Sequence, residues 1–282
     1  MTGVQTCALP ISQPPKYTGG YAELETPYFE TERGVLYHGN CLDIMPQIPA
    51  GSIDMILCDL PYGTTDCDWD ICIDLERLWA EYRRIAKPNA AIVLTAQQPF
   101  ATDLINAARR WFRYEIIWEK SIALGFLSAK KMPLRAHENI LVFYRALPTY
   151  NPQMTRGNPY RYSASSPHSK GTPLYRLAGK VASLNAGTRY PRSVQFWPQE
   201  HHGKHPTEKP QAMFEWLIRT YTYPREIVLD NCMGGGTTAT ACEVTRRKWI
   251  GIEKEEKFCI AIRRRLEPIL AQRLLPFDDP EI

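Results

Sequence analysis

The sequence predicts an α/β fold in which a mixed, mostly parallel sheet carries helices on both faces. Three short apolar runs, Ser52–Cys58, Ile227–Asp230 and Trp249–Ile252, have the length and the flanking turn residues of buried strands. A glycine turn and a helical run join the last two into a strand–helix–strand unit, which favours parallel pairing. At 282 residues and 44% apolar composition, the chain can bury a full core of this kind.

The first run ends abruptly at an acidic residue. Asp59 follows the apolar residues at once, and the chain then turns through Leu60 and Pro61 into Tyr62. In open α/β sheets ligands bind at the carboxyl ends of the strands, so we interpret Asp59–Tyr62 as a catalytic corner. The alternative is an ordinary strand-to-loop corner with a capping aspartate. The tetrapeptide alone does not decide between the two.

The second and third runs flank the glycine turn Met233–Gly236, which lets the backbone approach a ligand closely. Glu253 ends the third run about 20 residues after the turn, where such units grip the two hydroxyls of an adenosine ribose. The consecutive glycines do not form the G-x-G-x-x-G cradle of a dinucleotide, and Asp230 would repel a pyrophosphate but suits an ammonium group. S-adenosylmethionine is therefore favoured over a dinucleotide. A glycine turn without any ligand is the remaining alternative.

The segment 201–210, HHGKHPTEKP, lies between these two constellations. We interpret it as a lid that its prolines stiffen and that presents Thr207 and Lys209 to the cofactor. A metal site on its three histidines is the alternative, but nothing nearby completes such a site, so no metal is predicted. The eight cysteines include no C-x-x-C pair, which indicates buried thiols in a reducing compartment and hence a cytoplasmic location.

Positive charge is concentrated in one part of the chain. Residues 120–204 contain thirteen Lys or Arg and two acids, a net +11, so with +4 for the whole chain the remainder carries −7. In 147–199 the basic residues alternate with aromatic ones, which suits phosphate contacts and stacking on bases. A solvated basic insertion without a ligand is the alternative. The predicted DNA-binding residues are Lys130, Lys131, Arg156, Arg161, Lys170, Arg176, Lys180, Arg189 and Arg192.

Taken together, these motifs resemble the beta-group S-adenosylmethionine-dependent DNA amino-methyltransferases. The resemblance extends from Val35 to Leu266 and rests on YHGNCLDIMPQIPAGSIDMILCDLPYG, HENILVFY, YPRSVQFWP, HPTEKP and LDNCMGGGTTATAC followed by WIGIE. The catalytic tetrapeptide precedes the glycine turn, with a basic segment between them, and this circular permutation defines the beta group. Four positions depart from the family pattern: Leu60 replaces a proline, Asn231 and Cys232 replace Pro-Phe, and Asn40 stands where Asp is common.

The resemblance implies a Rossmann-like class I methyltransferase fold with a circularly permuted, seven-stranded, mostly parallel sheet and a target-recognition insertion. The implied parts are an N-terminal arm (1–33), a catalytic half (34–146), the insertion (147–203), a cofactor-binding half (204–275) and a tail (276–282). The arm is expected to be disordered or partly artefactual, because its first dozen residues resemble a translated sequencing adapter. The implied catalytic residues are Asp59, Leu60, Pro61 and Tyr62. The implied S-adenosylmethionine-binding residues are Asn40, Asp59, Thr207, Lys209, Asp230, Cys232, Gly234, Gly236, Thr237, Thr238 and Glu253.

The implied activity is methylation of the N6 amino group of a flipped-out adenine in double-stranded DNA. The acid at position 59 favours adenine, whereas a serine there is commoner in N4-cytosine enzymes, which remain the alternative. Carbon methylation of cytosine is unlikely because the chain contains no Pro-Cys pair. Remote alternatives are an NAD-dependent oxidoreductase and a catalytically silent nucleic-acid binder. The expected partners are double-stranded DNA, a second copy in a homodimer and a cognate restriction endonuclease, with no membrane.

Overall fold

The computed structural model of the chain describes residues 26–63, 72–162, 183–199 and 208–273. Several predicted positions lie outside these residues: Thr207, Lys170, Arg176, Lys180, the three histidines of the predicted lid, the tail 276–282 and most of the N-terminal arm. Among the described residues, no helix has the length and apolar character needed to cross a membrane.

The main sheet is mixed and mostly parallel, as predicted, but it has nine strands among the described residues rather than seven. In spatial order these are β1 (Phe29–Glu30), β2 (Gly34–His38), β13 (Lys248–Glu253), β12 (Ile227–Asp230), β3 (Ile53–Asp59), β4 (Ala86–Ala96), β6 (Arg135–Phe143), β5 (Phe112–Leu124) and β11 (Val194–Phe196). The two additional strands are short and lie at the edges. β1 pairs antiparallel with β2, and β11 pairs parallel with β5, so both satisfy backbone groups that an open edge would expose.

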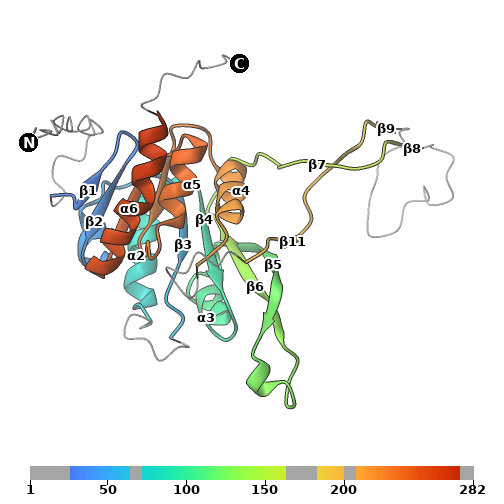
Figure 1. Cartoon of the computed structure of the whole chain (residues 1–282), viewed down its shortest axis with the longest axis horizontal. Coiled ribbons are helices and arrows are strands. Elements are labelled where there is room, and N and C mark those ends of the chain that lie inside the picture. The colour runs from blue at the N-terminus through green and yellow to red at the C-terminus, as the bar shows by residue number, and fades with distance from the viewer. Residues whose placement is uncertain (1–25, 64–71, 163–182, 200–207, 274–282) are drawn as a thin grey trace, which may run out of the picture.

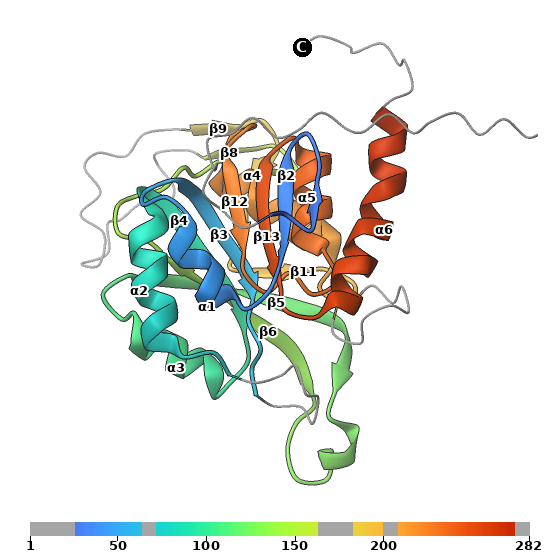
Figure 2. The ribbon, with the colours of Figure 1, turned by 90° about the vertical axis from the view of Figure 1, so that its left-hand side faces the viewer.

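Helices cover both faces of this sheet, which confirms the predicted layers (Figures 1 and 2). On one face lie α1 (Cys41–Ile44), η1 (Met45–Gln47), α2 (Leu75–Ile85) and α3 (Phe100–Ala107), and on the other lie α4 (Gln211–Tyr221), α5 (Thr237–Thr245) and α6 (Glu256–Arg273). Strand β3 shows why both faces are covered. Ile56 and Cys58 pack on the side of α2, whereas Met55 and Leu57 pack on the side of α4. A strand that is apolar on both faces must be buried between two layers.

The register of the parallel strands brings their carboxyl ends to one edge of the sheet. Asp59 at the end of β3 lies beside Thr95 on β4, and Asp230 at the end of β12 lies beside Gly251 on β13. The antiparallel pair β5–β6 reaches the same edge from its own direction, with Trp118 opposite Glu138. This edge is therefore where the acids predicted from three separate runs meet.

Two small two-stranded sheets lie in the segment interpreted above as the target-recognition insertion. β7 (Thr155–Arg156) pairs with β10 (Thr188–Arg189), and β8 (Tyr160–Tyr162) pairs with β9 (Ser183–Asn185). Figure 1 shows these strands leading away from the body of the protein before the chain returns through β11. A second projection is the hairpin of β5 and β6, which carries the short helix η2 (Phe126–Ser128) at its end.

Candidate functional site

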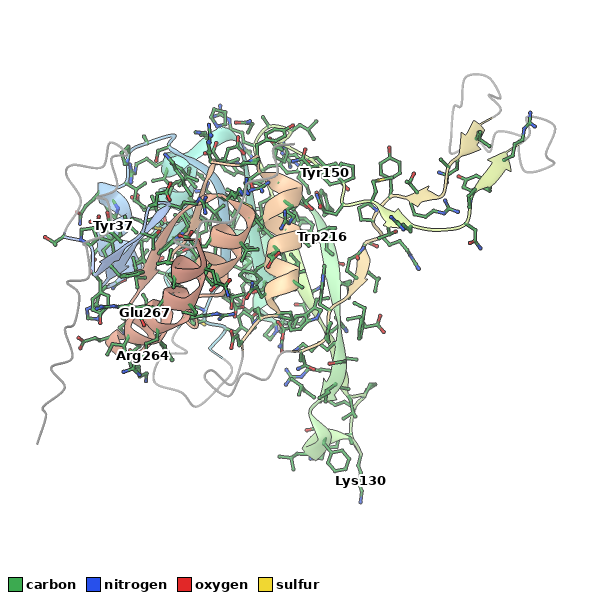
Figure 3. All side chains as sticks on the ribbon, turned by 45° about the horizontal axis from the view of Figure 1, so that its top comes forward. Tyr37, Lys130, Tyr150, Trp216, Arg264 and Glu267 are labelled. Atoms are coloured by element: carbon green, nitrogen blue, oxygen red, sulfur yellow. The ribbon has the colours of Figure 1, made fainter. Side chains whose placement is uncertain are left out.

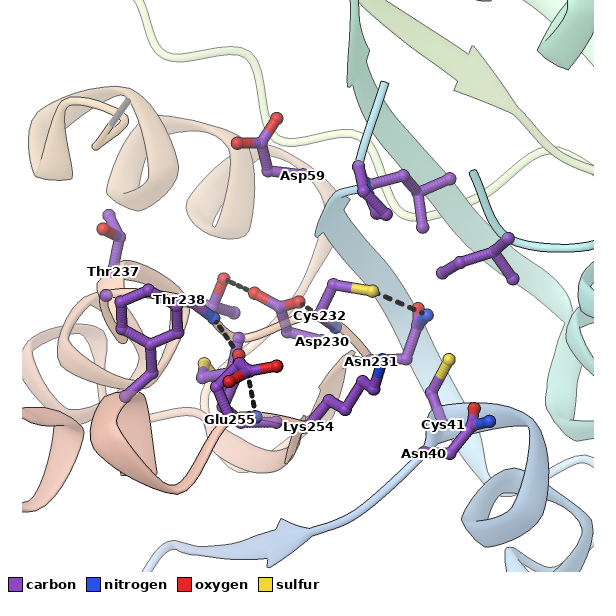
Figure 4. A pocket seen from close by; sticks show the side chains of 18 of the residues that line it. Asn40, Cys41, Asp59, Asp230, Asn231, Cys232, Thr237, Thr238, Lys254 and Glu255 are labelled. Carbon is purple, nitrogen blue, oxygen red and sulfur yellow. Dashed lines mark hydrogen bonds between the residues drawn. The ribbon is translucent and has the colours of Figure 1, made fainter. Parts of the chain in front are cut away.

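A pocket of about 350 Å³ opens at the carboxyl edge, within the size range of small-molecule sites. It lies between the ends of β3, β12 and β13 and the starts of α1 and α5 (Figure 4). Nearly all described residues that the sequence assigned to catalysis or cofactor binding line it: Asn40, Asp59, Leu60, Pro61, Tyr62, Lys209, Asp230, Cys232, Gly234, Thr237, Thr238 and Glu253. Gly236 is the exception, and it caps the N-terminus of α5.

At the catalytic corner the Asp59 carboxylate has three donors. The Tyr62 hydroxyl donates at 2.7 Å, the Lys209 ammonium donates at 2.6 Å, and the Thr95 hydroxyl completes the set. The Tyr62 ring packs against Phe100 with 5.6 Å between centroids. The Leu60 side chain, in the place of the family's proline, is buried in the core cluster under α2 and α3. The corner is thus anchored on both sides of Asp59.

Lys209 lies at the centre of a chain of alternating buried charges that the sequence did not reveal. Its ammonium lies 2.6 Å from Asp59 and 3.5 Å from Glu138, and Glu138 also accepts from Lys120. Gln97 donates to the same Glu138 carboxylate at 2.8 Å. We call Asp59, Lys209, Glu138 and Lys120 the charge network.

Mutual attraction keeps the inner members of the charge network ionised despite their burial. Burial lowers the pKa of Lys209, but Asp59 and Glu138 outweigh it and raise that pKa above its ordinary value. Burial likewise raises the pKa of Glu138, but Lys209 and Lys120 outweigh it and hold that pKa below its ordinary value. Glu138 belongs to the motif HENILVFY, but the sequence analysis predicted no role for it. The feature that could have indicated a role is its position, an acid at the start of an apolar run.

The glycine turn is held by the two acids that flank it. Asp230 accepts from the backbone N–H of Cys232 at 3.1 Å and from the Thr238 hydroxyl. Glu253 accepts from the backbone N–H of Gly234 at 2.7 Å. Gly234 and Gly236 adopt φ values of +51° and +80°, a region that favours glycine. The turn is therefore a fixed shape, and the oxygens that shape it also face the pocket.

Thiols occupy the part of the pocket where the family has Pro-Phe. The Asn231 side chain accepts from the Tyr82 hydroxyl at 2.5 Å and donates to the Cys232 sulfur at 3.5 Å. Burial raises the pKa of the neighbouring Cys58 thiol to about 12. All six described cysteines are free, and four are buried, as predicted. In the part of the chain that the structure describes, no group of three or more His, Cys, Asp or Glu could hold a metal ion.

The predicted DNA-binding residues that the structure describes do not line the pocket, and they are divided between the two projections. Lys130 and Lys131 lie on the β5–β6 hairpin and are exposed. The others lie on the segment that carries β7 to β10 and the residues after it: Arg156, Arg161, Arg189 and Arg192. The Arg189 guanidinium stacks 4.8 Å from the centre of the Tyr160 ring, an instance of the basic and aromatic alternation noted in the sequence.

The charge of the pocket distinguishes between the two cofactors considered. Six acidic residues line it (Asp59, Asp74, Glu208, Asp230, Glu253 and Glu255) against two lysines, Lys209 and Lys254. Such a lining repels the pyrophosphate of a dinucleotide and attracts a ligand that carries a sulfonium and an ammonium group. The residues present therefore fit S-adenosylmethionine.

The α/β sheet and the acidic pocket at its carboxyl edge fit the class of methyl-group transferases that the motifs resemble. The sequence matches the family described as DNA methylase (N6_N4_Mtase) over residues 53–264, three quarters of the chain. The chain belongs to this family. It is accordingly a DNA amino-methyltransferase with S-adenosylmethionine as its methyl donor, and the resemblance stated from the motifs is confirmed.

Individual relatives are distant but align over most of their length. The chain is 27% identical to the DNA adenine methyltransferase YhdJ of Escherichia coli (strain K12), over 85% of this chain and 84% of the relative. It is 25% identical to the type II methyltransferase M2.LlaDCHI of Lactococcus lactis subsp. cremoris, over 89% and 96% respectively. Among solved structures, the cytosine-N4-specific PvuII DNA methyltransferase matches with a TM-score of 0.62 at 14% identity, covering 88% of this chain and 95% of that one. The complex of M1.HpyAVI with S-adenosylmethionine matches with a TM-score of 0.55 at 20% identity, covering 82% and 97%.

Asp230 provides a pH test of the cofactor site. Burial raises its pKa to about 6, against the opposing effect of hydrogen bonds from Thr238 and Cys232. Only the ionised carboxylate attracts an ammonium group, so the expectation that Asp230 binds that group predicts that affinity for S-adenosylmethionine increases as pH rises through this value. We expect the Kd measured by calorimetry to be about tenfold higher at pH 5 than at pH 7, a range in which an amino group stays protonated. Asp230→Asn should bind more weakly and show a flat profile. A wild-type Kd independent of pH would contradict the assignment of Asp230.

Proposed function

We propose that the protein methylates the N6 amino group of adenine at a specific sequence in double-stranded DNA. The observation that carries the proposal is the Asp59 carboxylate, which lines the same pocket as Asp230, the glycine turn and Glu253. A carboxylate at this position accepts hydrogen bonds from an amino group more strongly than a serine hydroxyl would. One distant relative, YhdJ, is named a DNA adenine methyltransferase, which supports the choice of adenine.

The corner is proposed to orient a weak nucleophile. The lone pair of an exocyclic amino group is delocalised into the base, so the nitrogen must be positioned before it reacts. S-adenosylmethionine supplies the electrophilic methyl group when bound. Asp59 accepts from one N–H and the Leu60 carbonyl from the other, which turns the lone pair toward the cofactor side of the pocket. When the nitrogen forms its new bond it releases one proton, for which the Asp59 carboxylate is the nearest base.

The surrounding residues are proposed to hold that carboxylate in place. The Lys209 ammonium and the Tyr62 hydroxyl donate to its two oxygens and fix both of them. Glu253 is proposed to bind the ribose hydroxyls of the cofactor, and Asp230 is proposed to bind its ammonium group. Cys232 is proposed to contact the cofactor from the position where the family has phenylalanine. Pro61 stiffens the corner, and the target base packs against the exposed part of Tyr62. A homodimer and a cognate restriction endonuclease belong to the same proposal.

The product identifies the activity. DNA incubated with the protein and S-adenosylmethionine should yield N6-methyldeoxyadenosine when it is digested to nucleosides and separated by mass. N4-methyldeoxycytidine alone would replace adenine with the cytosine alternative, and no methylated nucleoside would favour a silent DNA binder. Sequencing of DNA methylated in a host without its own methyltransferases then gives the recognition sequence.

A further inference from the structure

The β5–β6 hairpin grows directly out of the catalytic edge. Lys120 on β5 and Glu138 on β6 belong to the charge network, and the hairpin consists of the residues between them. The strands remain paired at least to Leu124 and Arg135. Four extended residues beyond Lys120 carry the chain roughly 13 Å past the charge network. Figure 3 shows Lys130 at the outer end of this projection.

The tip of the hairpin presents large apolar side chains to solvent. Gly125, with φ of +94°, turns the chain into η2, where Phe126 is 80% exposed and Leu127 is fully exposed at 102%. Ile122 on β5 and Met132, between η2 and β6, are also more than half exposed. Exposed apolar groups that cluster in this way mark an interaction site. Because these side chains contribute nothing to the core, their function must lie in a contact with another molecule.

The positive charge of the hairpin indicates which kind of molecule its tip contacts. Residues 120–137 contain four basic residues (Lys120, Lys130, Lys131 and Arg135) and no acid. In a two-fold dimer the same patch would meet itself, and two such hairpins would repel each other. Duplex DNA can bind both parts of the hairpin, because its phosphates attract the lysines and its stacked bases offer apolar surfaces to the side chains at the tip. Proteins that insert Phe or Leu between base pairs while basic residues hold the backbone use the same combination.

We propose that Phe126 and Leu127 form a wedge that enters the base stack next to the target and keeps the target base outside the duplex. The inference rests on the proposed function and deepens it. The amino-binding corner lines a pocket in the body of the protein, so a base must leave the stack to reach it, and unstacking is costly. Lys130 and Lys131 hold the backbone while the apolar tip fills the space that the base leaves. The hairpin and the pocket share one edge of the sheet, so a single approach of the duplex engages both.

The test compares the double variant Phe126→Ala/Leu127→Ala with wild type on two duplexes that carry the recognition sequence. In the first the target adenine is paired, and in the second it faces an abasic position, so that no base pair has to be opened and extrusion is easier. We expect methylation of the paired duplex to fall by roughly 10- to 100-fold, and methylation of the second to stay near the wild-type rate. With 2-aminopurine at the target, the rise in fluorescence that wild type produces should be largely lost in the variant.

The control is Tyr223→Ala. Tyr223 is 55% exposed but precedes β12, at the edge of the sheet opposite the pocket, so its removal should change neither readout. An equal loss on both duplexes, or no loss on either, would overturn the wedge. Sedimentation that shows a dimer in wild type and a monomer in the double variant would assign the tip to a second copy and would also overturn it. If wild type itself forms no methyladenine, the proposed function fails instead, and the two failures are thereby distinguished.

Discussion

Asp59→Ala should lower kcat for methyl transfer by roughly 100- to 1,000-fold, the usual effect of removing one preorganised hydrogen-bonding group from a reacting centre. The carboxylate is proposed to accept one N–H of the target amino group, and Lys209 and Tyr62 hold it in place. Affinity for DNA should change little, because the predicted DNA-binding residues lie elsewhere. Affinity for S-adenosylmethionine should fall less than the rate, because Asp59 is one of several residues proposed to bind it. Single-turnover transfer of a labelled methyl group measures the rate, and calorimetry measures the two affinities.

Asp54→Asn is the matched control for this experiment. Asp54 lies on the same strand, β3, but outside the pocket, where it pairs with Lys87. Its replacement should leave the methyl-transfer rate close to that of wild type. Turnover retained in Asp59→Ala at the wild-type rate would show that the amino group is oriented by something else.

Lys209→Met should be the most destabilising of the single changes considered. It leaves Asp59 and Glu138 without the ammonium that lies between them, and removing one partner of a buried ion pair costs about 3–5 kcal/mol in the free energy of unfolding. The side chain of Lys209 is only 5% exposed, so water cannot replace it. Denaturant unfolding followed by far-UV circular dichroism gives the value.

The chain contains a matched pair for comparison. Lys87 and Asp54 also lie 2.6 Å apart and also involve an aspartate of β3, but the Lys87 side chain is 38% exposed. Lys87→Met should therefore cost only about 0–1 kcal/mol, as exposed ion pairs do. Equal losses in the two variants would mean that burial does not set the strength of the charge network.

The positions of the main acids follow from sequence because strand ends are local features. An apolar run that stops at Asp59, Asp230 or Glu253 marks the carboxyl end of a strand, and parallel pairing then brings such ends to one edge. The strand–helix–strand pattern predicts the pairing of β12 with β13, whereas the pairing of β3 with β12 joins distant parts of the chain and does not follow from that pattern. Most of the pocket lining could still be predicted from the strand ends.

The charge network could not be predicted in the same way. Lys209 and Asp59 are 150 positions apart, and their contact depends on how the segment before α4 returns to the sheet. Glu138 and Lys120 meet because β5 pairs antiparallel with β6, and β6 in turn pairs with β4. Local periodicity in the sequence does not predict such a strand order. The edge strands β1 and β11, two and three residues long, are too short to leave a pattern at all. The excess of basic residues predicted a polyanionic partner, but it did not predict that these basic residues are divided between two separate projections.

The central claim is that the Asp59 corner and the glycine turn form one site for the target amino group and its methyl donor. A crystal structure of the protein with S-adenosylhomocysteine and a duplex carrying the recognition sequence tests it most directly. The account predicts an extruded adenine whose N6 lies about 2.7–3.2 Å from an Asp59 oxygen, with the ligand's amino group beside Asp230. A target base bound away from Asp59, or a ligand bound away from the glycine turn, would contradict the account.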